Sequence, residues 1–130
     1  MREYFRDRLA NGLRLVTVEM PHLHCAEMAC YIQVGGRAES ADLAGISHFL
    51  DHILFRGSLD FPSTFVLERA FDAIGGAVNA ATDVESPCYH SRFHPQHLDE
   101  AARLFASLLT RPLFADVELE RRIILEEALD

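Results

Sequence analysis

The 130-residue chain has few basic residues and no long apolar run. Its 12 Lys and Arg residues are outnumbered by 20 Asp and Glu residues, which gives a formal net charge of −8. Proteins that bind nucleic acid or an anionic membrane present a basic surface, so this charge balance speaks against both partners. No apolar segment approaches the roughly 18 residues that a transmembrane helix needs. We therefore expect neither nucleic-acid binding nor membrane insertion.

The chain also lacks the sequence features of a secreted protein. Residues 1–8 are mostly charged and contain no apolar signal-peptide core. The three cysteines are irregularly spaced, which fits reduced thiols better than a disulfide framework. We expect an acidic, globular, cytoplasmic protein. Its length suffices for one hydrophobic core, and no repeat or linker divides residues 1–130.

Turn residues divide the chain into short strands and amphipathic helices. The dipeptide Asn11-Gly12 is a strong hairpin signal, because both residues tolerate positive φ. Alternating apolar residues and turn signals predict strands at residues 4–10, 13–20, 25–34, 77–82 and 88–93. Helical periodicity and capping residues predict helices at residues 45–57, 64–74, 95–110 and 116–127. The pattern indicates an α+β fold, in which amphipathic helices pack on one side of an antiparallel-rich β-sheet.

The predicted helix at residues 45–57 carries the clearest chemical signal. Its apolar stripe consists of Ile46, Phe49, Leu50, Ile53 and Leu54. His48, Asp51 and His52 lie on the opposite side of the helical wheel. Two imidazoles one turn apart can bind a single metal ion, and a neighbouring carboxylate can accept a proton from water. We expect Ser40 or Asp42 to cap the start of this helix and Gly57 to cap its end.

A chance match is the alternative for so short a motif. In a chain with 7 His and 20 acidic residues, the pattern H-x-x-[DE]-H arises in roughly one chain in twenty. On that interpretation both histidines are ordinary surface residues, and Asp51 is a solvated charge. A third ligand elsewhere in the chain would favour the metal site.

The last predicted helix, residues 116–127 with an Asp cap, offers such a ligand. Glu120 and Glu127 share the helix face of Ile123 and Ile124. A carboxylate on a buried face is costly unless it is paired or binds a metal. Either the two glutamates form buried salt bridges with arginines elsewhere, or Glu127 completes a two-His-one-Glu zinc site.

The end of the chain suggests that the domain continues. The last helix reaches Asp130 without a Gly or Asn cap, and the predicted strands are too few to bury all the amphipathic helices. We therefore expect residues 1–130 to be the N-terminal part of a single larger domain.

Four segments together resemble the pitrilysin-type (inverzincin) zinc metallopeptidases, whose zinc motif is H-x-x-E-H. The segments are residues 11–16, 45–57, 74–82 and 120–127. They cover nearly the whole chain in the order found in that family. The resemblance implies a zinc-dependent endopeptidase that hydrolyses extended peptides through a zinc-activated water.

The resemblance also implies roles for individual residues. His48, His52 and Glu127 would bind one Zn²⁺ per chain, and Glu120 would support the site from outside the coordination sphere. Asp51 would be the catalytic base. The edge strand that binds the peptide substrate by main-chain pairing would consist of Asn79, Ala80, Ala81 and Thr82. For the two alanines, simple packing within a strand is the alternative.

One residue departs from the family motif, since Asp51 stands where the family has Glu. The side chain is shorter by about 1.5 Å, and a misplacement of about 1 Å at a reacting centre can cost about 10²-fold in rate. A non-catalytic paralogue that acts as a scaffold or partner subunit is therefore the alternative function. Family members enclose substrate between two homologous halves. The implied partners are a peptide substrate and either the remaining half of the same protein or a homologous subunit.

Overall fold

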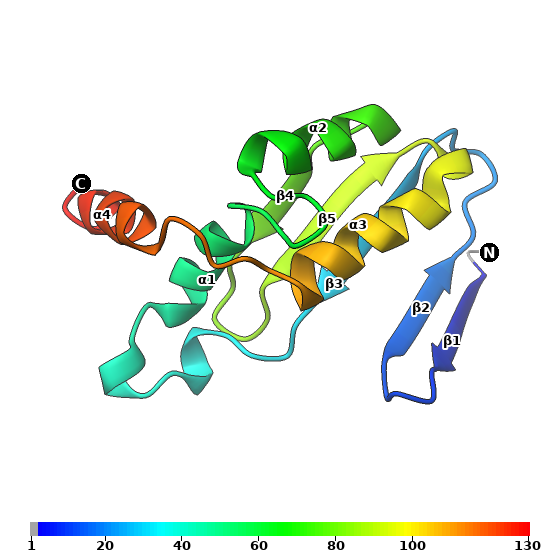
Figure 1. Ribbon diagram of the computed structural model, residues 1–130. Helices are drawn as coiled ribbons and strands as arrows, with labels where there is room; N and C mark the ends of the chain where they lie inside the picture. Colours follow the sequence, from blue (N-terminus) through cyan, green and yellow to red (C-terminus); the bar gives the residue numbers. More distant parts are fainter. Residues whose placement is uncertain (1–2) are drawn as a thin grey trace.

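The structure is a computed structural model that describes residues 3–130 (Figure 1). Residues 1 and 2, part of the charged segment that speaks against a signal peptide, lie outside the described residues. The strands are β1 (Tyr4–Arg8), β2 (Arg14–Val18), β3 (Ala26–Tyr31), β4 (Val78–Ala81) and β5 (Cys88–Phe93). The α-helices are α1 (Ile46–Leu54), α2 (Thr64–Ile74), α3 (Leu98–Thr110) and α4 (Val117–Glu127). Every predicted strand and helix is present, and the prediction of an α+β fold is confirmed.

The strands form two antiparallel sheets. Strands β1 and β2 make a hairpin, and Gly12 in its turn has a φ of 90°. The second sheet has the order β3-β5-β4, so β4 is an edge strand and β5 is paired on both sides. The hairpin belongs to a separate sheet on the N-terminal side of the molecule (Figure 1).

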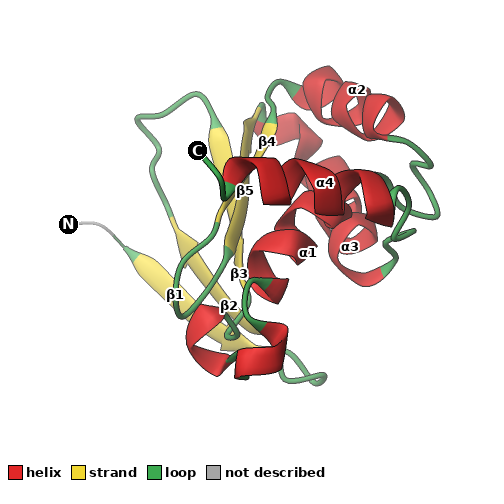
Figure 2. Cartoon of the chain, turned by 90° about the vertical axis from the view of Figure 1, so that its left-hand side faces the viewer, coloured by secondary structure: helices red, strands yellow, loops and turns green. Residues whose placement is uncertain are grey.

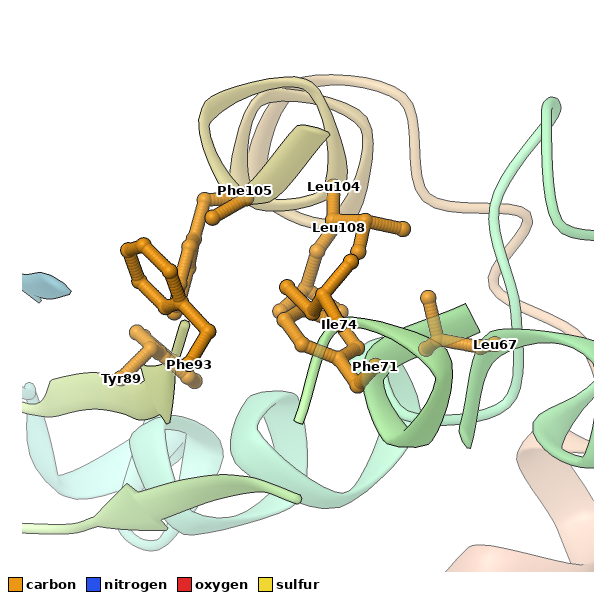
Figure 3. Close-up of a cluster of buried hydrophobic side chains, with 9 residues drawn as sticks. Leu67, Phe71, Ile74, Tyr89, Phe93, Leu104, Phe105 and Leu108 are labelled. Carbon is orange, nitrogen blue, oxygen red and sulfur yellow. The ribbon is translucent and has the colours of Figure 1, made fainter. Parts of the chain in front are cut away.

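The hydrophobic core lies between the three-stranded sheet and helices α2 and α3. Figure 2 shows the α-helices gathered on one side of the sheets, as the sequence predicts. The buried core residues are Leu67, Phe71, Ile74, Tyr89, Phe93, Ala101, Leu104, Phe105 and Leu108 (Figure 3). The rings of Phe71 and Phe105 pack edge to face, with their centroids 5.4 Å apart. Tyr89 is the one core side chain in this cluster that carries a polar group.

Helix α2 joins the edge strand β4 through two glycines. Gly75 forms its C-cap with a φ of 116°, which agrees with the predicted end of this helix at residue 74. Gly76 then passes so close to β5 that a Cβ atom there would overlap the carbonyl oxygen of Arg92. This close approach fixes the end of α2 against the central strand.

We expect Gly76→Ala to lower the free energy of unfolding by about 1–3 kcal/mol, because the new methyl group would force β5 or the turn to shift. Gly36→Ala is the matched control, since a Cβ at Gly36 has nothing within 4 Å. Urea unfolding of both variants measures the difference. Equal stability of the two variants would contradict the close approach.

The start of helix α1 differs from the prediction. Neither Ser40 nor Asp42 caps it; Gly45 takes the N-cap position and offers no side chain. Instead, the Glu39 carboxylate accepts hydrogen bonds from the N–H groups of Gly45 and Ser47, at 2.7 and 2.8 Å. These bonds, led by the one from Ser47, lower the pKa of Glu39. A carboxylate also suits the positive end of the helix dipole, so a residue six positions upstream replaces the expected cap.

The end of α1 also differs from the prediction. Phe55 is its C-cap, and Gly57 lies two residues further on with a φ of 125°. A Cβ at Gly57 would come within 2.8–3.0 Å of the backbone of residues 61–63. The glycine therefore serves the turn that leads toward α2 and does not cap the helix.

The buried face of α1 is not the predicted apolar stripe alone. Ile53 is fully buried, but Ile46 and Leu50 remain 36% and 39% exposed. Asp51, which we placed on the polar face, is only 4% exposed. The sheet side of α1 thus covers a carboxylate, and this carboxylate requires polar partners there.

Helix α4 packs beside α1, but few of its side chains are buried. Asp116 occupies the predicted N-cap position, yet it has a left-handed φ of 56° and its side chain makes no capping hydrogen bond. Glu120 is the one buried residue of α4. Ile123 and Ile124 are half-buried, so the polar cluster around Glu120 is the one fully buried contact of α4.

Within residues 3–130, each helix falls short of the length and apolarity that a bilayer crossing demands. The cytoplasmic location stays a prediction.

Candidate metal centre

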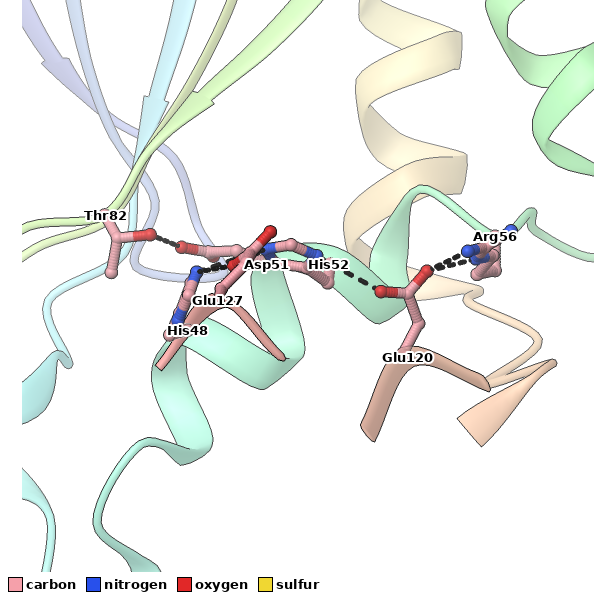
Figure 4. A network of polar contacts seen from close by, with 7 residues as sticks. All are labelled: His48, Asp51, His52, Arg56, Thr82, Glu120 and Glu127. Atoms are coloured by element: carbon pink, nitrogen blue, oxygen red, sulfur yellow. Dashed lines mark hydrogen bonds and ion pairs between the residues drawn. The ribbon is translucent and has the colours of Figure 1, made fainter. Parts of the chain in front are cut away.

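Helices α1 and α4 bring the three predicted metal ligands together. The Nε2 atoms of His48 and His52 lie 3.1 Å apart. Each of these atoms is 3.7 Å from Oε2 of Glu127, at the end of α4 (Figure 4). In the part of the chain that the structure describes, these three residues alone form a group of ligand atoms spaced closely enough for one metal ion.

The spacing of these atoms fits a zinc ion. Zinc bonds of about 2.0–2.2 Å at tetrahedral angles place neighbouring ligand atoms about 3.4 Å apart. The observed separations of 3.1 and 3.7 Å lie on either side of that value. Two imidazoles and one carboxylate leave a fourth position for water or substrate, as in catalytic rather than structural zinc sites.

The neighbouring carboxylate of Glu120 orients one of the histidines. Oε2 of Glu120 lies 3.1 Å from Nδ1 of His52, so Nδ1–H donates and the lone pair of Nε2 faces Glu127 and His48. The other oxygen, Oε1, accepts from the guanidinium of Arg56. Glu120 is only 3% exposed. The buried salt bridge to an arginine, one of our two alternatives, is thus present at Glu120, where it also supports His52.

Glu127 behaves differently from Glu120. Its side chain is half exposed, and the charged or ionisable groups paired with it among the described residues are the two histidines. The two glutamates share a helix face as predicted, but only Glu120 is buried. Their surroundings match a supporting residue at Glu120 and a candidate ligand at Glu127.

We expect Arg56→Met to lower the free energy of unfolding of the metal-free protein by about 3 kcal/mol, because it leaves the Glu120 carboxylate buried without its cation. Arg37→Met is the control: Arg37 pairs with Glu85 at the surface, and losing this pair should cost less than about 1 kcal/mol. Urea unfolding in the presence of a chelator compares the two. Similar losses in both variants would argue against a buried pair.

Asp51 lies on the same helix as the histidines and has two hydroxyl partners. The Tyr89 hydroxyl donates to Oδ1 of Asp51, and the Thr82 hydroxyl donates to Oδ2 (Figure 4 shows the Thr82 bond). Burial, together with the hydrogen bond to Asp51, raises the pKa of Tyr89. The phenol therefore stays protonated and acts as the donor. The sequence does not single out Tyr89, because the residue pattern of a strand says nothing of where a hydroxyl group reaches.

A cavity of about 530 Å³ extends from His48 and His52 to the edge strand β4. Its wall includes His48, Asp51 and His52 on one side. Three of the four residues predicted to bind substrate also line it: Asn79, Ala80 and Thr82. Ala81 does not line the cavity. The cavity thus joins the two histidines, the buried Asp51 carboxylate and residues of β4, whereas Glu127 is not part of its lining.

The chain is similar in sequence to a known protein family. The model of the insulinase family (peptidase family M16) matches residues 14–130. An uncharacterized zinc protease of Mycobacterium leprae is 39% identical over 124 residues, which cover 94% of this chain and 28% of that protein. The uncharacterized zinc protease YmxG of Bacillus subtilis is 34% identical over 119 residues, which cover 90% of this chain and 29% of that protein.

Two solved structures share the fold at 26% sequence identity. A protease from Helicobacter pylori aligns with a TM-score of 0.89, over 98% of this chain and 31% of that one. Pitrilysin aligns with a TM-score of 0.83, over 98% of this chain and 14% of its own. The chain thus spans less than a third of the length of these relatives. The family match and the shared fold show that this chain belongs to peptidase family M16, the pitrilysin-type zinc proteases.

Proposed function

We propose that the chain forms the metal-binding and proton-transferring part of a zinc endopeptidase that hydrolyses extended peptides. The observation that carries this proposal is that His48, His52 and Glu127 lie close enough to bind one metal ion. Both histidines also line a cavity that reaches residues of β4. We assign one Zn²⁺ per chain to these three residues. Membership of a zinc protease family supports the same reading.

The residues around the proposed site have distinct tasks. Zinc, when bound, supplies a Lewis acid and lowers the pKa of a bound water toward about 7. Glu120 holds His52 with its Nε2 lone pair toward the metal position, and Arg56 holds Glu120. Asp51 accepts a proton from the attacking water and returns it to the leaving amine.

The edge of β4 is the proposed binding surface for the substrate backbone. In the sheet order β3-β5-β4, one side of β4 has no strand paired with it among the described residues. An extended peptide can pair with such an edge through main-chain hydrogen bonds. The small side chain of Ala80 and the neighbouring Asn79 line the cavity there and let a peptide backbone come close.

We further propose that residues 1–130 are the N-terminal part of a single peptidase domain, and that the remaining half of the same protein or a homologous subunit completes the enclosure of substrate. The apolar side chains left exposed on α1, Ile46 and Leu50, suit contact with such a partner. On this proposal the chain alone is a poor peptidase even when zinc is bound.

Metal analysis of the zinc-loaded chain tests the site. We expect one zinc per chain, and we expect Glu127→Gln to weaken zinc affinity by about tenfold or more, because the neutral amide is a poorer ligand than the carboxylate. Glu126→Gln is the matched control, since Glu126 is the exposed neighbour on the same helix. Competition with a chelator measures both affinities. Equal affinity in the two variants would contradict the assignment of Glu127.

A further inference from the structure

Two hydroxyl groups from the sheet hold the carboxylate of Asp51. Tyr89 lies on β5 and Thr82 directly follows β4, whereas Asp51 lies on α1. Each hydroxyl donates to a different carboxylate oxygen. We propose that Tyr89 and Thr82 are positioning residues that set the orientation of the Asp51 carboxylate for proton transfer. This inference rests on the proposed peptidase function.

The position of the Tyr89 hydroxyl is fixed by the core. Tyr89 is 3% exposed, and its ring centroid lies 6.3 Å from that of Phe55. Its strand is held on both sides, since Tyr89 pairs with Cys30 of β3 and with Ala80 of β4. Because the tyrosine ring is fixed in this way, its hydroxyl group cannot move with the Asp51 carboxylate. The carboxylate must therefore take the orientation in which it accepts this hydrogen bond. Such rigid support is what places a reacting group to within a fraction of an ångström.

Thr82, which lies on a different segment from Tyr89, adds a second constraint on the Asp51 carboxylate. It comes directly after β4, and it lines the cavity together with Asp51. With one hydroxyl on Oδ1 and the other on Oδ2, rotation of the carboxylate about its last bond would break both hydrogen bonds. We predicted from the sequence that Thr82 contacts substrate. That prediction concerns main-chain pairing and stays a prediction, whereas the hydroxyl of Thr82 has a partner within the protein, which supports a positioning role.

The two buried carboxylates, Asp51 and Glu120, differ in the kind of hydrogen-bond donor that each receives. Glu120 is bound to the permanent charge of Arg56, which suits a group that only orients His52. Asp51 receives hydrogen bonds from neutral hydroxyls, and among the described residues no cation is paired with it. Hydroxyl donors can orient a carboxylate without placing a fixed positive charge beside the proposed metal ligands.

We expect the same two contacts to favour an aspartate over a glutamate at this position. Helix α1 and the sheet are separated by a span that one aspartate bridges with both of its oxygens. A glutamate would carry its carboxylate about 1.5 Å further from the helix, and a displacement of that size is enough to lose alignment with fixed donors. We therefore expect a glutamate at position 51 to lose at least one of these two hydrogen bonds.

Variants that remove one hydroxyl at a time test the inference in the full-length protein. Tyr89→Phe removes the phenol oxygen alone. Thr82→Val removes the hydroxyl at nearly constant size, and Thr82→Ser keeps it. We expect Tyr89→Phe and Thr82→Val each to lower kcat about tenfold or more with KM changed less than about twofold. Thr82→Ser should recover kcat to within about threefold of the wild-type value.

Zinc affinity supplies a readout that does not depend on turnover. Because neither hydroxyl is a ligand, chelator competition should give affinities within about twofold of wild type for all three variants. Zinc loss in parallel with kcat would show that the hydroxyls support the metal site and would overturn the inference. So would unchanged kcat in both Tyr89→Phe and Thr82→Val. If Thr82→Ser were as impaired as Thr82→Val, packing rather than the hydroxyl would be responsible, and the inference would again fail.

A different set of results would contradict the proposed function. An inactive wild-type protein, or full turnover in Asp51→Asn, would contradict proton transfer by Asp51 whatever the hydroxyl variants do. An active wild type with an inactive Asp51→Asn, but with unaffected hydroxyl variants, would overturn the positioning role alone. If Tyr89→Phe does not fold, Thr82→Val and Thr82→Ser still test the positioning role.

Discussion

Replacing Asp51 with asparagine is expected to lower kcat by at least about 10²-fold while zinc stays bound. The amide has nearly the same shape and can still accept a hydrogen bond, but it cannot take a proton from water. Loss of a general base typically costs about 10²- to 10⁴-fold. Steady-state kinetics of the full-length protein, with metal analysis of the same preparation, checks both halves of the expectation. An Asp51→Asn variant that turns over normally would show that Asp51 is not the base.

Asp51→Glu distinguishes two accounts of the departure from the family motif. Because both aspartate oxygens already have hydroxyl partners, we expect the longer acid to lower kcat about tenfold, by breaking the contacts with Tyr89 and Thr82. Increased turnover would mean instead that the site keeps the geometry of the family glutamate. If neither acid supports activity, the alternative function applies, in which the protein is a non-catalytic paralogue that serves as a scaffold or partner subunit.

The second large effect is expected at His52. His52→Ala should weaken zinc affinity by more than about 10²-fold, beyond the 10- to 100-fold that loss of a supporting residue usually costs. The substitution removes a nitrogen ligand and also leaves Glu120 without the imidazole that it holds. Chelator competition measures the affinity, and circular dichroism confirms that the variant is folded.

His22→Ala is a suitable control for that experiment. His22 is an exposed residue in the segment between β2 and β3 and is not part of the candidate metal group. The His22→Ala variant should bind zinc with the affinity of the wild-type protein. If the two histidine variants had the same affinity, the zinc would have to be bound elsewhere.

Local signals predict much of the fold. Helix α2 begins after Ser63 and ends at Gly75, as predicted, because the Ser63 hydroxyl accepts from the N–H of Val66 and because glycine allows the left-handed C-cap. Strand β5 also has its predicted bounds. In both cases the residues that set the boundary are neighbours in the sequence.

Contacts between distant segments could not be predicted in the same way. The helical wheel places Asp51 opposite the apolar stripe, but it cannot tell which side of the helix the sheet will cover. The Thr82 and Tyr89 hydroxyls lie 31 and 38 residues away from Asp51 along the chain. Likewise, the Glu39 cap depends on the turn that precedes α1. The resemblance to a family was needed to predict separate roles for Glu120 and Glu127, because the helical wheel alone left both a salt bridge and a metal site open.

The shallow packing of α4 has a consequence for the kinetics of the proposed metal site. Only one side chain of this helix is buried, and α4 contributes no residue to the core cluster. An element with so little buried apolar surface can open locally at a free energy well below that of global unfolding. Each opening carries Glu127 away from the two histidines, which stay on α1. Zinc exchange would then proceed at a rate set by the opening of α4, and a partner that covers this helix would slow zinc release without touching the metal.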